Sequence, residues 1–132
     1  MIKFKRTNFF PQKDIIDVKF LNSLLSDNLK DFKLTFRSKY RAADIEPKKN
    51  SIVPGGLFEI SKSDEIKLDV YEDFPILYKK YYFYYYGKKV MTYTMVKKSP
   101  FKFPTERYLN VVKRGYKDCK LDGSVLIKSL KP

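Results

Sequence analysis

Two kinds of hydrophobic pattern alternate along the chain. Apolar residues that recur at every third or fourth position predict helices at about residues 14–29, 61–72, 105–117 and 123–130. Apolar residues in continuous or alternating runs predict strands at residues 2–9, 32–36, 52–58, 76–86 and 90–96. The polar residues 37–50 are expected to form a loop with a short extended piece. This mixture favours an α+β fold in a single domain, residues 1–132.

The predicted helix at residues 61–72 has clear boundary signals at both ends. Ser61 and Asp64 have the spacing of a capping box at its start. Phe74 precedes a proline, and a residue in that position is pushed out of the α region, so the helix should end before it. Glu72 is therefore expected at a helix C-terminus, at the entry to the next strand.

A carboxylate in that position is suited to proton transfer. The negative end of the helix dipole disfavours its charged form, and Tyr71, Phe74 and Tyr78 are close enough in sequence to desolvate it. Both effects move the pKa of a carboxylate toward the range that serves a general base. The alternative is that Glu72 is one of several solvated acids on a polar helix face.

Composition narrows the class of protein. The chain has 132 residues, of which 43% are hydrophobic and 17% aromatic, enough for one buried core. We expect no membrane partner and a cytoplasmic location, because no apolar run approaches a membrane span and no hydrophobic segment follows the charged start. Cys119 is the only cysteine and histidine is absent, which excludes an internal disulfide framework and histidine-activated nucleophiles. We also expect no metal site.

The formal net charge of +13 is unevenly distributed. Between residues 74 and 117, eleven lysine and arginine residues stand against one acid, Glu106. Such a field attracts nucleotides, phosphates, nucleic acid or an acidic protein, or the lysines simply keep a tyrosine-rich β surface soluble. The tyrosines at residues 81–86 can stack bases or pack in the fold with their hydroxyls at the rim. No nucleic-acid motif accompanies them, which favours packing.

Three segments resemble the central signature of the γ-glutamylcyclotransferase-like family, which includes the γ-glutamylamine cyclotransferases. They are V-P-G-G-L-F-E-I at 53–60, L-D-V-Y-E at 68–72 and P-I-L-Y-K at 75–79. Residues 103–121 are similar to the closing pattern of the family, and the whole resemblance covers about residues 31–130. The glutamate of this motif is the catalytic acid/base of the family, so the resemblance assigns that role to Glu72.

The resemblance implies a small mixed β-barrel flanked by helices and an enzyme that needs no cofactor. In this family the α-amine of a γ-glutamyl compound attacks its own γ-carbonyl, which releases 5-oxoproline and an amine. The family binds this small-molecule substrate with the backbone amides of its first loop, which Thr7 and Asn8 match here. A pocket must also hold the flexible glutamyl chain in a folded shape. The candidates for this are the Gly55 and Gly56 backbone and the side chains of Tyr78, Tyr93 and Tyr108.

Some residues depart from the family pattern. Lys5 and Arg6 stand where the family has tyrosine and glycine, and Asp73 stands where it has glycine. Because glycine allows positive φ and close backbone approach, the amide cradle is altered here, or Arg6 supplies the charge that amides supply elsewhere. A second hypothesis is therefore an altered family member whose basic pocket binds an anionic small molecule, such as a nucleotide signal. A third is a basic module that binds protein or nucleic acid, with Glu72 incidental.

Overall fold

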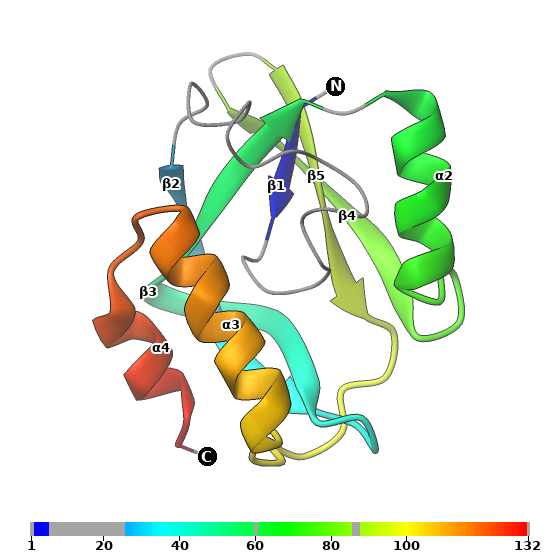
Figure 1. The fold of residues 1–132 in the computed structure, drawn as a ribbon. Helices are drawn as coiled ribbons and strands as arrows, with labels where there is room; N and C mark the ends of the chain where they lie inside the picture. Colours follow the sequence, from blue (N-terminus) through cyan, green and yellow to red (C-terminus); the bar gives the residue numbers. More distant parts are fainter. Residues whose placement is uncertain (1, 6–25, 60, 86–87, 132) are drawn as a thin grey trace.

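The computed structural model describes residues 2–5, 26–59, 61–85 and 88–131, arranged as Figure 1 shows. The described strands form one five-stranded sheet in the order β2-β3-β1-β5-β4. They are β1 (Ile2–Lys5), β2 (Ser26–Arg37), β3 (Ala42–Glu59), β4 (Tyr78–Tyr85) and β5 (Lys88–Met95). The helices are α2 (Lys62–Tyr71), α3 (Glu106–Asp118) and α4 (Gly123–Ser129).

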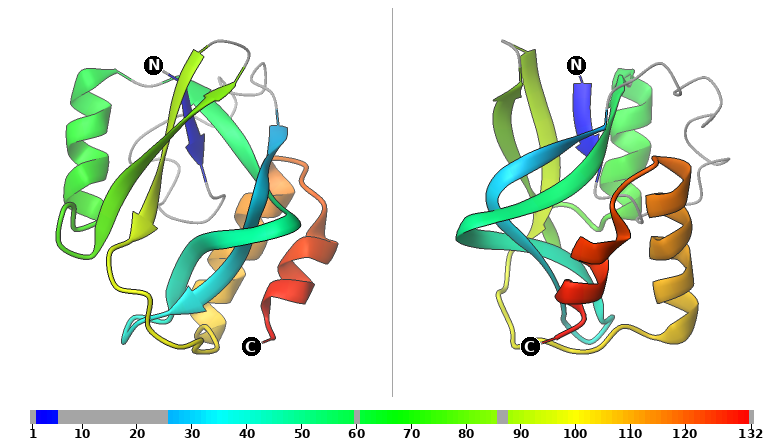
Figure 2. Two further views of the ribbon diagram at one scale, coloured as in Figure 1. Left: turned by 180° about the vertical axis from the view of Figure 1, so that it is seen from behind. Right: turned by 90° about the vertical axis from the view of Figure 1, so that its left-hand side faces the viewer.

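The sheet is mixed and strongly curved (Figure 2). Strand β1 pairs antiparallel with β3 and parallel with β5, while β2–β3 and β4–β5 are antiparallel pairs. The rings of Phe32 in β2 and Tyr81 in β4 lie 5.2 Å apart, so the two edge strands meet through side chains. The predicted small mixed α+β fold is confirmed, although no ladder joins β2 to β4 among the described strands.

The described helices form two groups around the curved sheet (Figures 1 and 2). Helices α3 and α4 pack next to each other beside β2 and β3, and α2 lies alongside β4. Helix α3 buries Leu109, Val112, Gly115 and Tyr116. Leu109, Val112 and Tyr116 lie three or four positions apart and form one helical stripe, while Val111 lies off this stripe and is 43% exposed.

One hydrophobic core fills the space between the sheet and the helices. It draws on β2, β3, β5 and α3, so that burial of apolar area ties the sheet to the helices. Its most deeply buried large apolar side chains are Phe36, Ile45, Val53, Val90, Met91, Met95 and Val112.

Several predicted elements are confirmed by their capping residues. The Ser61 hydroxyl accepts from the Asp64 N–H at 3.1 Å, and the Ser61 N–H donates to the Asp64 carboxylate, so the capping box forms. Thr105 caps α3 in the same position. Strands β4 and β5 form the predicted hairpin. Residues 86–87, and residues 6–9 of the predicted first strand, lie outside the described residues.

Two predicted elements are wrong. Residues 26–29 belong to β2 instead of the predicted helix, whose remainder lies outside the described residues. Leu29 pairs with Val53 and is buried, so cross-strand pairing outweighs the helical spacing. The expected loop at residues 37–50 is largely strand β3. Its polar residues Asp44 and Glu46 are tolerated in the sheet because Arg37 pairs with both.

Candidate active site

Glu72 occupies the end of helix α2. Its backbone N–H donates to the Leu68 carbonyl at 2.8 Å, and it is the C-cap residue that the sequence predicts. Its side chain is buried, since the residue is only 4% exposed. The alternative of a solvated acid on a polar helix face is therefore wrong. Burial also means that its charge acts in surroundings of low polarity, where electrostatic interactions are strong.

The chain reverses direction directly after Glu72. The Phe74 N–H donates to the Asp69 carbonyl at 2.9 Å, and the Asp73 N–H donates to the Val70 carbonyl at 3.2 Å. This pair of bonds is a Schellman motif, in which the residue after the cap adopts positive φ and glycine is favoured. Asp73 adopts φ 51° without being glycine, and aspartate is one of the few residues that tolerate this region. The turn leads the chain back toward β4.

A cavity of about 270 Å³ lies at this turn. The end of α2, the start of β4, the start of β3, the turn between β2 and β3, and helix α3 all contribute to it. Its volume and partly aromatic walls suit a small ligand. Its described lining residues are Tyr40, Ala42, Tyr71, Glu72, Asp73, Leu77, Tyr78 and Tyr108.

Two of the lining tyrosines are fixed by the backbone of Ala43 in β3. The Tyr78 hydroxyl donates to the Ala43 carbonyl at 2.7 Å, and the Ala43 N–H donates to the Tyr108 hydroxyl at 3.0 Å. Tyr78 comes from β4 and Tyr108 from α3. These bonds therefore join three elements at one wall of the cavity and hold the two rings in place.

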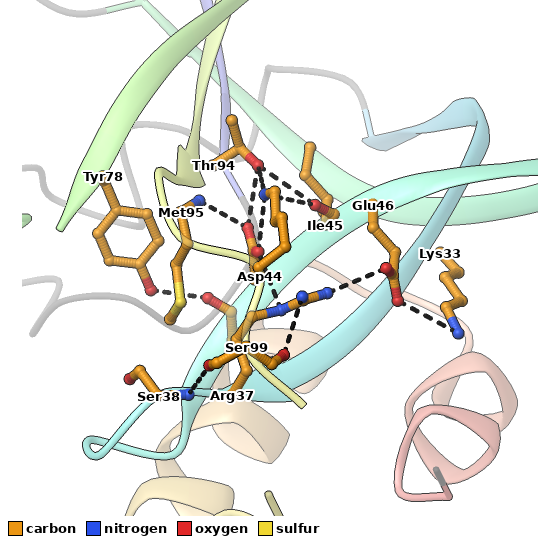
Figure 3. A network of polar contacts seen from close by, with 12 residues as sticks. Lys33, Arg37, Ser38, Asp44, Ile45, Glu46, Tyr78, Thr94, Met95 and Ser99 are labelled. Carbon is orange, nitrogen blue, oxygen red and sulfur yellow. Dashed lines mark hydrogen bonds and ion pairs between the residues drawn. The ribbon is translucent and has the colours of Figure 1, made fainter. Parts of the chain in front are cut away.

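A buried ionic network lies beside this wall (Figure 3). Asp44 has no exposed surface, and its carboxylate accepts from the Met95 N–H and the Lys98 ammonium, each at 2.8 Å. The Arg37 guanidinium lies 3.2 Å from Asp44 and 3.1 Å from Glu46. A buried carboxylate is stable only when it is paired in this way. The network holds β3 in register against β5 next to the cavity.

Tyr93 takes part in a second network, which joins β5 to α2. Its hydroxyl donates to the Asp69 carboxylate, which also binds Lys80 at 2.9 Å. Lys80 reaches Glu65 as well, at 2.8 Å. Burial raises the pKa of Tyr93, and its bond to Asp69 raises it further. These contacts anchor α2, and with it Glu72, on the β4–β5 hairpin.

The described lining of the cavity is acidic. It contains the carboxylates of Glu72 and Asp73 and no lysine or arginine.

Within the described part of the chain, no cluster of three or more histidine, cysteine or acidic side chains could hold a metal ion. None of the described helices is both long enough and apolar enough to cross a membrane.

No protein-family model matches the sequence, and no curated protein matches it. Solved structures do match the fold. YkqA from Bacillus subtilis has a TM-score of 0.77 and 18% identity over 97% of this chain, which spans about half of YkqA, 52% of its length. A γ-glutamyl cyclotransferase has a TM-score of 0.70 and 19% identity, covering 100% of this chain and 88% of that one. This chain has the γ-glutamyl cyclotransferase fold. A human protein, loc79017, shares it, with a TM-score of 0.68, 20% identity and coverage of 99% and 88%.

The γ-glutamyl cyclotransferase fold brings together only some of the residues that the sequence singles out. Glu72, Tyr78 and Tyr108 line the cavity. Tyr93 is outside its described lining and supports α2 instead. Gly55 and Gly56 are buried in β3, also outside that lining. Residues 6–8, the predicted Arg6-Thr7-Asn8 loop, lie outside the described residues.

Three residues line the cavity that the sequence did not predict there, Tyr40, Asp73 and Leu77. Tyr40 belongs to the turn between β2 and β3, a region predicted as part of a polar loop. The sequence marks Asp73 as unusual in one respect, because it stands where the family pattern has a glycine. Its φ of 51° explains why glycine suits the position, and the residue lines the cavity.

Proposed function

We propose that this chain is a γ-glutamyl(amine) cyclotransferase that releases 5-oxoproline, with Glu72 as its general acid/base. The observation that carries the proposal is a buried glutamate that lines a small cavity in this fold, within the L-D-V-Y-E motif. A buried ionisable group in a cavity is a candidate for catalysis. The fold match supports the same assignment.

The reaction forms a bond from the α-nitrogen to the γ-carbonyl carbon and breaks the γ-amide bond. The α-ammonium loses two protons as it becomes the lactam nitrogen, and the departing nitrogen gains two and leaves as an ammonium. Atoms and charge balance without another reactant. The Glu72 carboxylate takes one proton from the α-nitrogen and passes it to the departing nitrogen, while the other proton exchanges through water.

In the proposed mechanism, the tyrosines of the cavity position the substrate and do not transfer protons. Tyr78 and Tyr108 are held by the backbone of Ala43, so their rings form rigid walls around the substrate. A flexible glutamyl chain gains rate when such walls favour its folded, near-attack shape. In the proposal, the backbone amides around Thr7 and Asn8 hold the oxyanion of the tetrahedral intermediate.

The described lining gives less support to an anionic ligand. Two carboxylates and no cationic side chain would repel a nucleotide from the part of the cavity that is described. The basic segment between residues 74 and 117 contributes no lysine or arginine to that lining. The cyclotransferase proposal therefore explains this cavity better than the binding of an anionic small molecule.

The test is a 5-oxoproline release assay over a panel of γ-glutamyl peptides and amines. We expect Glu72→Gln to lower kcat by about a hundredfold or more, which is the usual contribution of a general acid/base. Glutamine keeps the volume of the buried side chain, so the thermal midpoint should stay close to that of the wild type. Glu106→Gln, at an exposed position on α3, is the matched control and should keep wild-type activity.

Two results would count against the proposal. Wild-type release by a folded Glu72→Gln protein would remove Glu72 from the mechanism. No release from any member of the panel by the wild-type protein would reject the activity itself.

A further inference from the structure

The candidate cavity has a buried end and an exposed mouth. Glu72 and Tyr78 are almost fully shielded from solvent at the buried end. Tyr40 and Tyr71 are 56% and 52% exposed, and Asp73 is exposed as well. A ligand that fills the cavity therefore meets a catalytic carboxylate at one end and two tyrosine rings with a second carboxylate at the other.

The carboxylate of Asp73 is open to a ligand. Its backbone is fixed, because its N–H donates to the Val70 carbonyl in the turn that ends α2. The structure records no hydrogen bond or ion pair from its side chain to any other described residue. The carboxylate of Asp69 on the same helix differs, since it is already bound by Lys80. The backbone of Asp73 is therefore fixed, while its carboxylate can pair with a charged group of a ligand.

The position of Glu72 decides which part of the substrate lies near Asp73. In the proposed reaction Glu72 takes a proton from the α-nitrogen, so the glutamyl half lies at the buried end. The leaving amine is therefore the half that extends toward the mouth. A positive nitrogen there would gain from the Asp73 carboxylate. The Tyr40 ring has the ammonium of Lys39 at 5.2 Å from its centroid, so we assign the ligand's cation to Asp73.

We propose that Asp73 selects γ-glutamyl substrates whose leaving amine carries a second, positively charged nitrogen, as in the mono-γ-glutamyl derivative of a diamine. This inference rests on the proposed cyclotransferase function and adds a specificity-determining residue to it. Glu72 still passes a proton from the α-nitrogen to the departing nitrogen, and the second nitrogen of the leaving amine keeps its positive charge throughout the reaction.

The test compares kcat/KM for two substrates of equal length. One is the mono-γ-glutamyl derivative of 1,4-diaminobutane, and the other is γ-glutamyl-n-pentylamide, in which a methyl group replaces the distal ammonium. We expect the wild-type protein to prefer the cationic substrate, and Asp73→Asn to lower this preference by about two- to fivefold, as expected for one partly exposed charge pair. Asparagine also tolerates φ 51°, so the turn should be kept.

Asp118→Asn is the matched control, since it removes the same charge from the exposed end of α3. It should keep the wild-type preference. Added salt should weaken the preference of the wild-type protein, because exposed charges are screened.

An equal preference in the wild type and Asp73→Asn, or a wild-type preference for the neutral substrate, would overturn the inference and leave the cyclotransferase function intact. Release from neither substrate, nor from any other γ-glutamyl compound, would instead reject the proposed function and this inference with it.

Discussion

After two of the described helices, a residue that is not glycine adopts the left-handed backbone region. Asp73 has φ 51° after α2, and Lys120 has φ 55° after α3. In both cases the bonds form a Schellman motif, as in the 2.8 Å bond from the Leu121 N–H to the Tyr116 carbonyl. Aspartate tolerates this region, but lysine gains nothing from it. Lys120 is therefore a site of local backbone strain.

We expect Lys120→Gly to stabilise the protein by about 0.5–1 kcal/mol, because glycine relieves the cost of positive φ but gives up some entropy in the unfolded chain. The free energy of unfolding in urea measures the effect. Lys117→Gly is the matched control within the same helix and should destabilise by up to about 1 kcal/mol. A loss of stability in both variants would contradict this account of the turn.

The β2–β3 hairpin depends on charges that sit inside a sheet. Glu46 in β3 binds Arg37 at 3.1 Å and Lys33 at 3.2 Å, both from β2. Burial alone would raise the pKa of Glu46, but the hydrogen bonds from Arg37 and Lys33 outweigh it and lower the pKa below its usual value. The folded state therefore favours the charged carboxylate, which links the stability of the hairpin to pH.

This linkage predicts a pH-dependent effect of Glu46→Gln. The stabilisation is complete above the unfolded pKa of about 4.3 and is lost as the pH falls through the lower folded pKa. At pH 7 we expect the variant to be less stable by about 0.5–1 kcal/mol, in the range of partly exposed ion pairs. Thermal unfolding of both proteins at neutral and acidic pH is the measurement. A stability gap that stays constant down to about pH 2 would exclude this role for the carboxylate.

At the scale of the whole molecule, the formal net charge of +13 works against the compact state. Most of the lysines whose side chains are described are exposed, and the ionic networks around Asp44 and Asp69 neutralise only a few of them. Salt should therefore screen repulsion more than it weakens attraction.

We expect the thermal midpoint to rise by a few degrees between about 20 mM and about 300 mM sodium chloride. Lys113→Glu, at an exposed position on α3, reduces the net charge and should reduce this dependence on salt. A midpoint that falls with salt would show that attractive ion pairs dominate over repulsion.

The sequence was sufficient to predict those elements whose ends are fixed by residues nearby in the chain. Ser61, Asp64 and Thr105 cap their helices through bonds to residues only three positions away, so neighbouring residues alone are enough to recognise them. The position of Glu72 at the end of α2 follows from the same signals. The β4–β5 hairpin was predictable because its two strands are adjacent in the chain.

Only the tertiary structure decided the remaining features, because they depend on residues far apart in the sequence. Residues 26–29 are strand because Leu29 meets Val53, and Asp44 is accepted inside β3 because Arg37 and Lys98 surround it. The burial of Glu72 depends on packing against other elements. The cavity, with its two carboxylates, exists only where the end of α2, the start of β3 and helix α3 meet, and no local pattern encodes that meeting.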